Sequence, residues 1–323
     1  MKAAMSKDSL ALLIPAYNSS PYLARLFKSI AEQTQPFDEI WLYDDCSSDD
    51  TAEMARAYGA KVVRGEVNRG CSHAKNALAS MTSCEWLHFH DADDEILPRF
   101  VECARAWMAK DEHDVVVFGS MEREHGTGRF LAQEWHDNDA LSADPVRYTI
   151  SRKISANAGI YRRTAFLAAG GFDTDRDVLY NEDVAMHCAL ARAGLRFAAE
   201  PTVLMINWRR PGSMTSADPA RCLRAHHRVM VKALEHDRRN AYHQEIAESL
   251  WNNATSAASV LDWRTADASA RLAFRLRGRP HRQSRLFRTL CLLGPRIALR
   301  LREGLIRLIK PQYRAGYRGW RLR

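Results

Sequence analysis

The stretch 86–95, WLHFHDADDE, ends in closely spaced acids that could hold a cation. Asp91 and Asp93 are two residues apart, so their side chains point the same way in extended backbone and can converge on one ion in a turn. Hard divalent cations such as Mg²⁺ take oxygen ligands, commonly one or two carboxylates together with substrate phosphates. Taken alone, an acidic turn before the helix that follows Pro98 explains these residues better, so a cation site needs support from elsewhere.

Two histidines in the same stretch offer a different kind of metal site. His88 and His90 share one face of the predicted strand, and His90 adjoins Asp91. Mg²⁺ bound to a diphosphate prefers oxygen ligands, whereas imidazole suits softer metals. We therefore expect His88 and His90 to be semi-buried strand residues rather than ligands.

Other acids occupy positions where they could act on a substrate. Asp44 and Asp45 follow a predicted strand and could accept hydrogen bonds from a nucleobase or ribose, although they also suit a turn with a helix cap. Glu182 and Asp183 open a predicted helix, whose dipole stabilises carboxylates there. The same dipole would keep a general base ionised.

The elements that must position these acids alternate between strands and helices. Strands are predicted at 10–14, 39–43, 60–64, 86–90 and 114–119. This alternation is typical of βαβ units in a mostly parallel sheet, whose ligand crevice lies at the carboxyl ends of the strands. Residues 120–155 are interpreted as a loop-rich insertion, 181–194 as a helix that stops at Gly194, and 217–270 as mainly helical.

Composition indicates a folded protein with reduced thiols. Apolar residues make up 46% and charged residues 27%, and the seven cysteines form no C-x-x-C pair. Because no signal-like segment or run of 18 apolar residues occurs, we expect a cytoplasmic protein without a spanning helix. Residues 271–323 contain 16 Lys and Arg but one acid, Glu303, so a basic tail follows a mildly acidic body. Such asymmetry indicates an anionic partner surface.

The tail contains two predicted amphipathic helices, separated at Gly294 and Pro295. Apolar residues line one face of each helix, with arginines at the borders of the second: Leu286, Leu290 and Leu293, then Ile297, Leu301, Leu305 and Leu308 beside Arg300, Arg302 and Arg307. This pattern favours a helix lying on an anionic membrane surface. Packing on the catalytic domain or on a second subunit is the alternative. Residues 312–323 mix Tyr, Trp and Arg as membrane anchors do, or are disordered. We expect no nucleic-acid partner, because the tail offers mainly Leu and Ile.

Five motifs, in order, resemble the inverting family 2 glycosyltransferases of the GT-A fold. They are IPAYN (14–18), YDDCSSDDT (43–51), NRGCSHAKNA (68–77), HDADD (90–94) and NEDVAMHCALARAG (181–194). The resemblance covers about residues 9–215. It implies an α/β fold of the Rossmann-like GT-A type, a mostly parallel sheet flanked by helices, with a C-terminal helical extension. The expected division is a nucleotide-sugar-binding and catalytic domain at 1–215, a helical extension at 216–270 and a basic amphipathic tail at 271–323.

The resemblance also implies roles for the donor-side residues that match its motifs. Pro15, Ala16 and Tyr17 would line the nucleotide pocket, and Asp45, with Asp44 beside it, would recognise the nucleobase, usually uracil. Asp91 would contact the ribose side and lie next to the metal. Asp93 would ligate the Mg²⁺ or Mn²⁺ that bridges the diphosphate.

The remaining matches lie near the acceptor and the diphosphate. Asp183, or else Glu182, would be the base that deprotonates the acceptor hydroxyl. Lys75, which stands where the family usually has Arg, is counted with the donor contacts, as are Arg209 or Arg210 with Ser213. Ala185 and Ala189 depart from the family pattern and leave the details of acceptor binding open.

These features predict a hexosyl- or N-acetylhexosaminyltransferase. It would move a sugar from a nucleotide-sugar, expected to be UDP-linked, to a glycan or lipid-linked hydroxyl in cell-surface polysaccharide synthesis. The cation would stabilise the departing diphosphate, and one base on the opposite face would give inversion. A nucleotidyltransferase is disfavoured because PAYNSSPY lacks a Gly-rich phosphate loop, and a silent binding module because Asp93 and Asp183 are retained. For a bacterial source, the tail predicts a peripheral position on the cytoplasmic face of the inner membrane. The sugar, acceptor, linkage and oligomeric state are not predicted.

Overall fold

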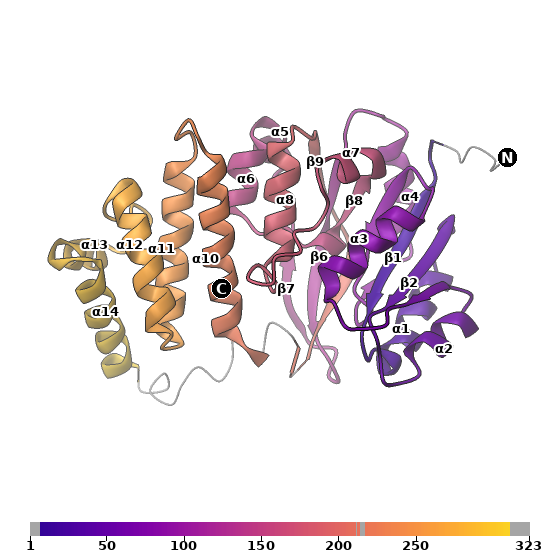
Figure 1. The fold of residues 1–323 in the computed structure, drawn as a ribbon, viewed down its shortest axis with the longest axis horizontal. Helices are drawn as coiled ribbons and strands as arrows, with labels where there is room; N and C mark the ends of the chain where they lie inside the picture. The colour runs from indigo at the N-terminus through magenta and orange to yellow at the C-terminus, as the bar shows by residue number, and fades with distance from the viewer. Residues whose placement is uncertain (1–6, 211, 214–216, 311–323) are drawn as a thin grey trace. The chain divides into compact units, whose positions relative to one another are not determined.

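The computed structural model describes residues 7–210, 212–213 and 217–310 of the 323-residue chain (Figure 1). The strands are β1 (Leu10–Ala16), β2 (Glu39–Asp44), β3 (Lys61–Arg64), β4 (Trp86–Phe89), β5 (Glu95–Ile96), β6 (Val115–Glu124), β7 (Phe130–Glu134), β8 (Gly159–Arg162) and β9 (Phe197–Arg209). The helices of the first part are α1 (Ser20–Ala31), α2 (Thr51–Ala57), α3 (Cys71–Met81), α4 (Phe100–Met108), α5 (Asn138–Ala143), α6 (Pro145–Ser151), η1 (Ala156–Ala158), α7 (Arg163–Ala168) and α8 (Glu182–Arg192). Those of the second part are α10 (Pro219–His236), α11 (His243–Ser259), α12 (Trp263–Arg277), α13 (Arg285–Leu290), η2 (Cys291–Leu293) and α14 (Pro295–Ile309). Pro211, Met214, Thr215 and the predicted anchor segment 312–323 lie outside the described residues.

The strands form one mixed sheet in the order β3-β2-β1-β4-β8-β6-β9-β5, with β7 paired to β6. The parallel β3-β2-β1-β4 half is the one predicted from the alternating pattern, and β6 and β9 add another parallel ladder. β8 runs antiparallel between β4 and β6. The α/β fold with a mostly parallel sheet flanked by helices is therefore confirmed.

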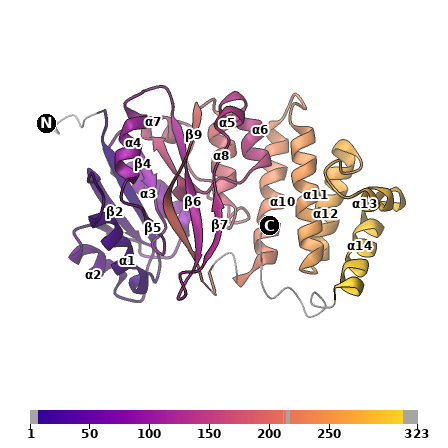
Figure 2. The ribbon, with the colours of Figure 1, turned by 180° about the vertical axis from the view of Figure 1, so that it is seen from behind.

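The sheet is buried on both faces at its centre, which explains the continuous apolar run of β1. All seven residues of β1 are buried, as expected for a strand covered on both sides. α3 packs on β1 and β2, and it lies with α8 on the near side of the sheet in Figure 1. Seen from behind, β6 and β7 stand in front of α8 (Figure 2). This arrangement carries the N-terminal ends of α3 and α8 to the predicted site.

The prediction of a loop-rich insertion at 120–155 was wrong. β6 continues to Glu124, β7 pairs back onto it, and α5 and α6 follow. The polar sequence SMERE (120–124) lacks the pattern of a strand, but it forms the end of β6 because it pairs with β9 along a long parallel ladder. The two strands approach each other closely at Gly119, where an added Cβ would lie 2.7 Å from the carbonyl oxygen of Pro201.

The chain divides into two compact units. The first comprises 1–149, 153–174 and 182–210, and the second comprises 150–152, 175–181 and 211–323. In the second unit α10, α11 and α12 lie side by side, and α14 packs on α11 and α12 (Figures 1 and 2). α12 passes through Ala270 without a break, and the predicted three-part division stays a prediction. Among the described residues, no helix is long and apolar enough to cross a membrane.

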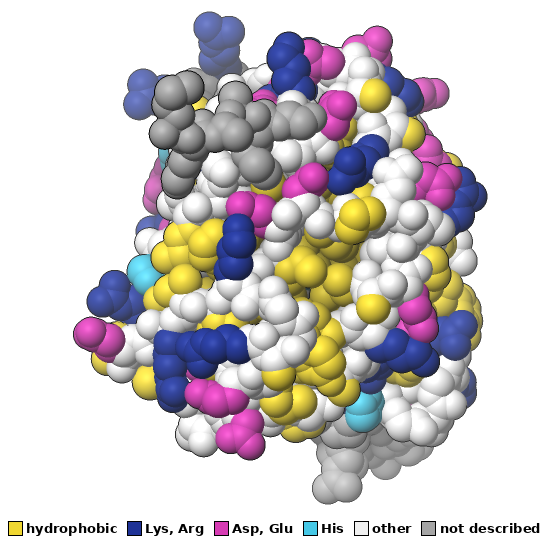
Figure 3. Space-filling model, turned by 90° about the vertical axis from the view of Figure 1, so that its right-hand side faces the viewer, with side chains coloured by type: hydrophobic (Ala, Val, Ile, Leu, Met, Phe, Trp, Pro, Cys, Tyr) yellow, Lys and Arg dark blue, Asp and Glu magenta, His cyan; other side chains and the backbone are white. Residues whose placement is uncertain are grey.

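The first unit carries exposed apolar side chains, among them Tyr58, Val67 and Met81, which are each more than 40% exposed. On the face that carries α2, hydrophobic side chains gather in the middle, with both basic and acidic side chains around them (Figure 3).

Candidate active site

Two of the four acids after β4 hold the sheet together. Asp94 is buried and accepts hydrogen bonds from the Trp208 backbone N–H at 2.8 Å and from Asn157 Nδ2 at 2.8 Å. Glu95 accepts one from Trp208 Nε1 at 2.9 Å. Both acids therefore anchor the end of β9 against the turn, which leaves Asp91 and Asp93 as the chemically available pair.

Asp91 and Asp93 each have a basic side chain beside them. Arg210 Nε lies 2.8 Å from Asp93 Oδ2, and Lys75 Nζ lies 3.7 Å from Asp91 Oδ1. Arg25 adds a hydrogen bond from its guanidinium to the Asp93 carbonyl oxygen. The acidic turn is thus balanced by side chains of the protein, a feature not predicted from the sequence.

Lys75 joins the acid after β4 to the acid that opens α8. Its Nζ lies 3.7 Å from Asp183 Oδ1, the same distance as from Asp91, and its side chain is only 4% exposed. The ammonium group also lies 5.0 Å from the centre of the Phe172 ring. A charge buried this deeply is stable only with opposite charges beside it, so Lys75 fixes the two carboxylates relative to each other.

This cluster shifts the pKa values of its members in different directions. Burial by itself would lower the pKa of Lys75, but Asp91 and Asp183 hold it well above its usual value. Burial, with Asp183 and Asp93 nearby, raises the pKa of Asp91 to about 6 even though Lys75 opposes the shift. Burial would also raise the pKa of Asp183, but Lys75 and Lys153 outweigh it and keep that pKa below its usual value. Asp183 is therefore the carboxylate of the cluster that stays ionised to lower pH.

Asp183 Oδ1 is buried and has no hydrogen-bond partner among the described residues, so it is able to accept a proton donor. The backbone carbonyl of Asp183 accepts from His187 Nδ1 at 2.8 Å, which ties the first turn of α8 to a buried histidine. Burial lowers the pKa of His187 to about 4, so this imidazole is neutral.

Glu182 points to a different partner. The Cys71 thiol at the start of α3 donates a hydrogen bond to Glu182 Oε1 at 3.1 Å. Burial and the nearby Glu182 carboxylate raise the pKa of Cys71 well above its usual value, so the sulfur stays protonated. Cys71 and His187 were missed in the sequence because nothing in their spacing shows that α3 and α8 meet.

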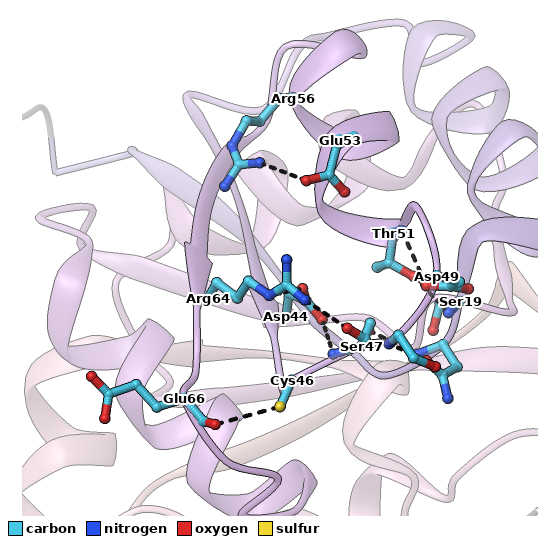
Figure 4. A network of polar contacts seen from close by, with 12 residues as sticks. Ser19, Asp44, Cys46, Ser47, Asp49, Thr51, Glu53, Arg56, Arg64 and Glu66 are labelled. Atoms are coloured by element: carbon cyan, nitrogen blue, oxygen red, sulfur yellow. Dashed lines mark hydrogen bonds and ion pairs between the residues drawn. The ribbon is translucent and has the colours of Figure 1, made fainter.

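The loop after β2 is a dense polar network (Figure 4). Asp44 is fully buried; its Oδ1 accepts from the Ser47 N–H at 2.9 Å and its Oδ2 lies 3.4 Å from Arg64 Nε. Asp45 is also buried, and its two oxygens accept from the backbone N–H groups of Arg69 and Gly70 at 2.9 and 2.7 Å. Both acids thus order the loops around the predicted nucleotide pocket.

The residues after β1 lie next to this network. Pro15 and Ala16 are buried, and the Ala16 carbonyl accepts from the Asp45 N–H at 2.8 Å. Tyr17 is 53% exposed, so its ring is available to a ligand. Asn18, with a φ of 49°, accepts from the Ser48 N–H at 2.8 Å and so links the first two loops.

The three residues predicted to contact the diphosphate, Arg209, Arg210 and Ser213, have different surroundings. Arg209 forms an ion pair with Glu122 at 2.5 Å, whereas Arg210 reaches Asp93 and stacks 4.7 Å from the Tyr22 ring centre. Ser213 belongs to the second unit, where its carbonyl accepts from the Ala217 N–H at 2.8 Å. Of the two arginines, Arg210 is the one that the structure brings to the acidic turn.

His88 and His90 are fully buried rather than semi-buried. His88 Nδ1 lies 2.9 Å from the Gly159 carbonyl oxygen and His88 Nε2 lies 3.2 Å from His90 Nδ1. Burial lowers the pKa of His88 to about 4 and that of His90 well below its usual value. They are neutral core residues that join β4 to β8.

The available carboxylates fit a divalent cation that is shared with a substrate. Asp93 and Asp91 are 25% and 45% exposed and offer only oxygen atoms, as Mg²⁺ and Mn²⁺ require. Within the ranges that the structure describes, no group of three or more His, Cys, Asp or Glu side chains is arranged to hold an ion. A cation at this turn would therefore need further oxygens, such as those of a diphosphate.

The mixed α/β sheet with acids at its strand ends is the architecture of the GT-A fold. The family model described as Glycosyl transferase family 2 matches residues 11–173, and the chain belongs to that family.

The similar curated proteins are matched over part of their length. An uncharacterised glycosyltransferase of Haemophilus influenzae is 31% identical over 94 residues, which is 29% of this chain and 32% of that protein. The poly(ribitol-phosphate) β-N-acetylglucosaminyltransferase TarS of Staphylococcus aureus is 27% identical over 182 residues, or 54% of this chain and 30% of TarS. The chain spans about a third of the length of these relatives.

Solved structures share the fold over nearly the whole chain. TarS 1–349 of S. aureus in complex with UDP-GlcNAc has a TM-score of 0.71 at 20% identity and covers 93% of this chain and 92% of that one. The mannosyltransferase PcManGT of Pyrobaculum calidifontis in complex with GDP-Man and Mn²⁺ has a TM-score of 0.56 at 19% identity, with 95% and 82% covered. At these identities the likeness establishes the GT-A fold with its C-terminal helical region.

Proposed function

We propose that this protein is an inverting glycosyltransferase that transfers a hexosyl or N-acetylhexosaminyl group from a UDP-sugar to a hydroxyl of a glycan or lipid-linked acceptor. The observation that carries the proposal is the Asp91–Lys75–Asp183 cluster, in which one buried ammonium lies 3.7 Å from each carboxylate. It joins an acid on the donor side to an acid suited to act as a base. The UDP-GlcNAc complex of TarS, a structural neighbour, supports a UDP-linked donor.

On the donor side, we assign each residue by its position around the first three loops. Pro15, Ala16 and Tyr17 line the nucleotide pocket, with Asp45 beside Asp44 facing the nucleobase. Asp45 already accepts two backbone hydrogen bonds, but each carboxylate oxygen has a second lone pair for a ligand. The same acid then orders the pocket and reads the base.

The diphosphate end of the donor is assigned to the turn after β4. Asp91 contacts the ribose side and Asp93, with Asp91 beside it, would hold Mg²⁺ or Mn²⁺. The cation, when bound, stabilises the negative charge that develops on the departing UDP. Arg210 is the leading phosphate contact, because its planar guanidinium suits phosphate oxygens and it already lies beside Asp93. Arg209 and Ser213 are secondary candidates.

Asp183 is the base in this proposal. Its carboxylate accepts the proton of the acceptor hydroxyl while the acceptor oxygen bonds to the sugar C1 and the C1–O bond to UDP breaks. Attack from the face opposite UDP inverts the anomeric carbon. Glu182 is the weaker candidate, because its Oε1 already accepts from the Cys71 thiol.

Two isosteric substitutions test these roles. Asp183→Asn should bind UDP with unchanged affinity in calorimetry but lose sugar transfer by at least about 10²-fold, the lower range for removal of a general base. Asp93→Asn should instead lose the effect of Mn²⁺ on UDP binding. The matched control is Asp177→Asn, an exposed acid outside the proposed site. Transfer by Asp183→Asn at the wild-type rate would refute the assignment of the base.

We also propose that the enzyme works peripherally on the cytoplasmic face of a bacterial inner membrane, in cell-surface polysaccharide synthesis. The bacterial glycosyltransferases among its relatives and the basic, amphipathic C-terminal helices support this location.

A further inference from the structure

α14 packs into the second unit through a face that carries an alanine, a leucine and a glutamate. Ala298 and Leu299 are fully buried, and Glu303 is 3% exposed. Glu303 pairs with Arg307 at 2.8 Å, and Arg307 also donates to the Ser259 carbonyl oxygen of α11 at 2.9 Å. This face attaches α14 to α11 and α12 through Ala298, Leu299 and Glu303, and it does not include Ile297, Leu301 or Leu305.

Three other large apolar side chains of α14 are exposed. Ile297, Leu301 and Leu305 of α14 are 51%, 43% and 39% exposed. α13 and η2, which both contact α14, add Leu286, Leu292 and Leu293, with exposures of 63%, 67% and 59%. We call these six residues the C-terminal apolar face. Exposed apolar side chains gathered in this number mark an interaction surface.

The exposed charges around this face are basic. Two of its arginines, Arg296 and Arg300, also lie 2.5 and 4.0 Å from the buried carboxylate of Asp267 in α12. Residues 285–310 contain seven Lys and Arg and a single acid, Glu303, which is buried and paired with Arg307. Arg285 and Arg288 are exposed on α13, and Arg296 and Arg300 on α14 are 61% and 51% exposed. The apolar area on the first unit differs, because acids and bases both surround it (Figure 3).

We propose that the C-terminal apolar face docks on a bilayer surface rich in anionic phospholipid. The leucines and isoleucine would enter the interface between head groups and acyl chains, while the surrounding arginines pair with lipid phosphates. This deepens the proposed function, and it rests on that function for the reason to bring the enzyme to a membrane. A second copy of the chain fits the charges poorly, because a two-fold interface through this face would bring its arginines against each other.

Flotation of the full-length protein with phosphatidylcholine vesicles, with and without phosphatidylglycerol, tests the proposal. The wild type should float with the anionic vesicles, and less at high salt. The double variant Leu301→Gln/Leu305→Gln should lose most of this binding. Arg285→Gln/Arg288→Gln should bind about 10- to 30-fold more weakly, because each basic residue contributes a few-fold.

The matched controls remove the same side chains elsewhere in the second unit. Leu261→Gln replaces a leucine that is 49% exposed, and Arg238→Gln/Arg239→Gln removes two exposed arginines between α10 and α11. Both should float like the wild type. Circular dichroism should show the same helix content for all variants, since the substituted side chains point outward.

The proposal is overturned if the wild type does not float with anionic vesicles, or if the Leu301→Gln/Leu305→Gln variant floats as well as the controls. It is also overturned if that variant dissociates an oligomer, seen by light scattering, while vesicle binding is unchanged. UDP binding measured without vesicles distinguishes failure of the docking proposal from failure of the proposed function. Loss of flotation with intact UDP binding would refute the docking proposal alone, whereas flotation without UDP binding would refute the proposed transfer from a UDP-sugar and leave the docking proposal standing.

Discussion

Replacing Lys75 with glutamine should move the pH dependence of sugar transfer. Lys75 lies 3.7 Å from Asp183 Oδ1 and is the strongest influence that lowers the pKa of that carboxyl. A pair of unit charges at this distance interacts by ~1 kcal/mol in a water-like environment and by ~4 kcal/mol at the effective dielectric of partly buried sites. Asp183 is 17% exposed and lies between these limits, so its pKa should rise by about 1 to 3 units, at ~1.4 kcal/mol per unit.

The direction of the pH shift follows from the protonation state in which Asp183 would act as the base. Asp183 accepts a proton only as the carboxylate, so a higher pKa removes the active form at low pH. The acidic limb of the kcat/KM profile should therefore move to higher pH by about 1 to 3 units in Lys75→Gln. The measurement is kcat/KM for transfer between pH 5 and 9, with UDP affinity followed by calorimetry at each pH.

Two variants serve as controls for Lys75→Gln. Lys75→Arg keeps the positive charge and should keep the acidic limb near its wild-type position. Lys153→Gln removes the weaker of the two lysines that lower the pKa of Asp183 and should give a smaller shift in the same direction. An acidic limb that does not move in folded Lys75→Gln, or that moves equally in Lys75→Arg, would show that this electrostatic reasoning is wrong.

Three further predictions concern stability, each checked by urea unfolding. Gly304→Ala should stabilise the protein by ~0.5–1 kcal/mol, because Gly304 lies within α14 with no atom near an added Cβ and Ala has the higher helix propensity. Gly119→Ala should destabilise it by about 1–3 kcal/mol, since the new Cβ would meet the Pro201 carbonyl oxygen at 2.7 Å; unchanged stability would contradict the close approach of β6 and β9. Although burial opposes it, hydrogen bonds led by that from Lys61 hold the pKa of Glu39 at about 2, so Glu39→Gln should cost about 1–3 kcal/mol at neutral pH. Because the folded pKa is depressed, that difference should shrink as the pH falls from about 4.5 towards 2, and a constant difference would exclude an ionic contribution.

The parallel half of the sheet could be predicted because its strands are apolar runs separated by helices. β1, β2, β3 and β4 lie within two residues of their predicted bounds. β7 pairs with the neighbouring β6, but the polar residues around this hairpin hide the alternation typical of a strand. The strands β8 and β9 have partners far away in the chain. Their order in the sheet depends on these distant pairings, which no local pattern encodes.

The site was predictable as a set of acids but not as a set of contacts. Asp183 and Asp91 were identified from their positions after a strand and at a helix start, with the family resemblance supplying their roles. The balancing charges were not, because a sequence does not show that the one lysine of α3 faces the acids. Lys75 was named as a substitution for Arg and counted with the donor contacts, and the structure shows it beside both acids. The orientation of α14 was equally hidden, since its packed face carries Ala298, Leu299 and Glu303.

The tie between Asp94 and Trp208 has a consequence for the order of folding. The carboxylate of Asp94 receives its backbone hydrogen bond from a residue 114 positions later, and Asp93 meets Arg210 across 117 positions. During synthesis, the acidic turn leaves the ribosome long before the strand that anchors it, and contacts closed over such distances form late. The proposed donor pocket would therefore be among the last parts of the first unit to form, and UDP binding would report that β9 has reached its place in the sheet.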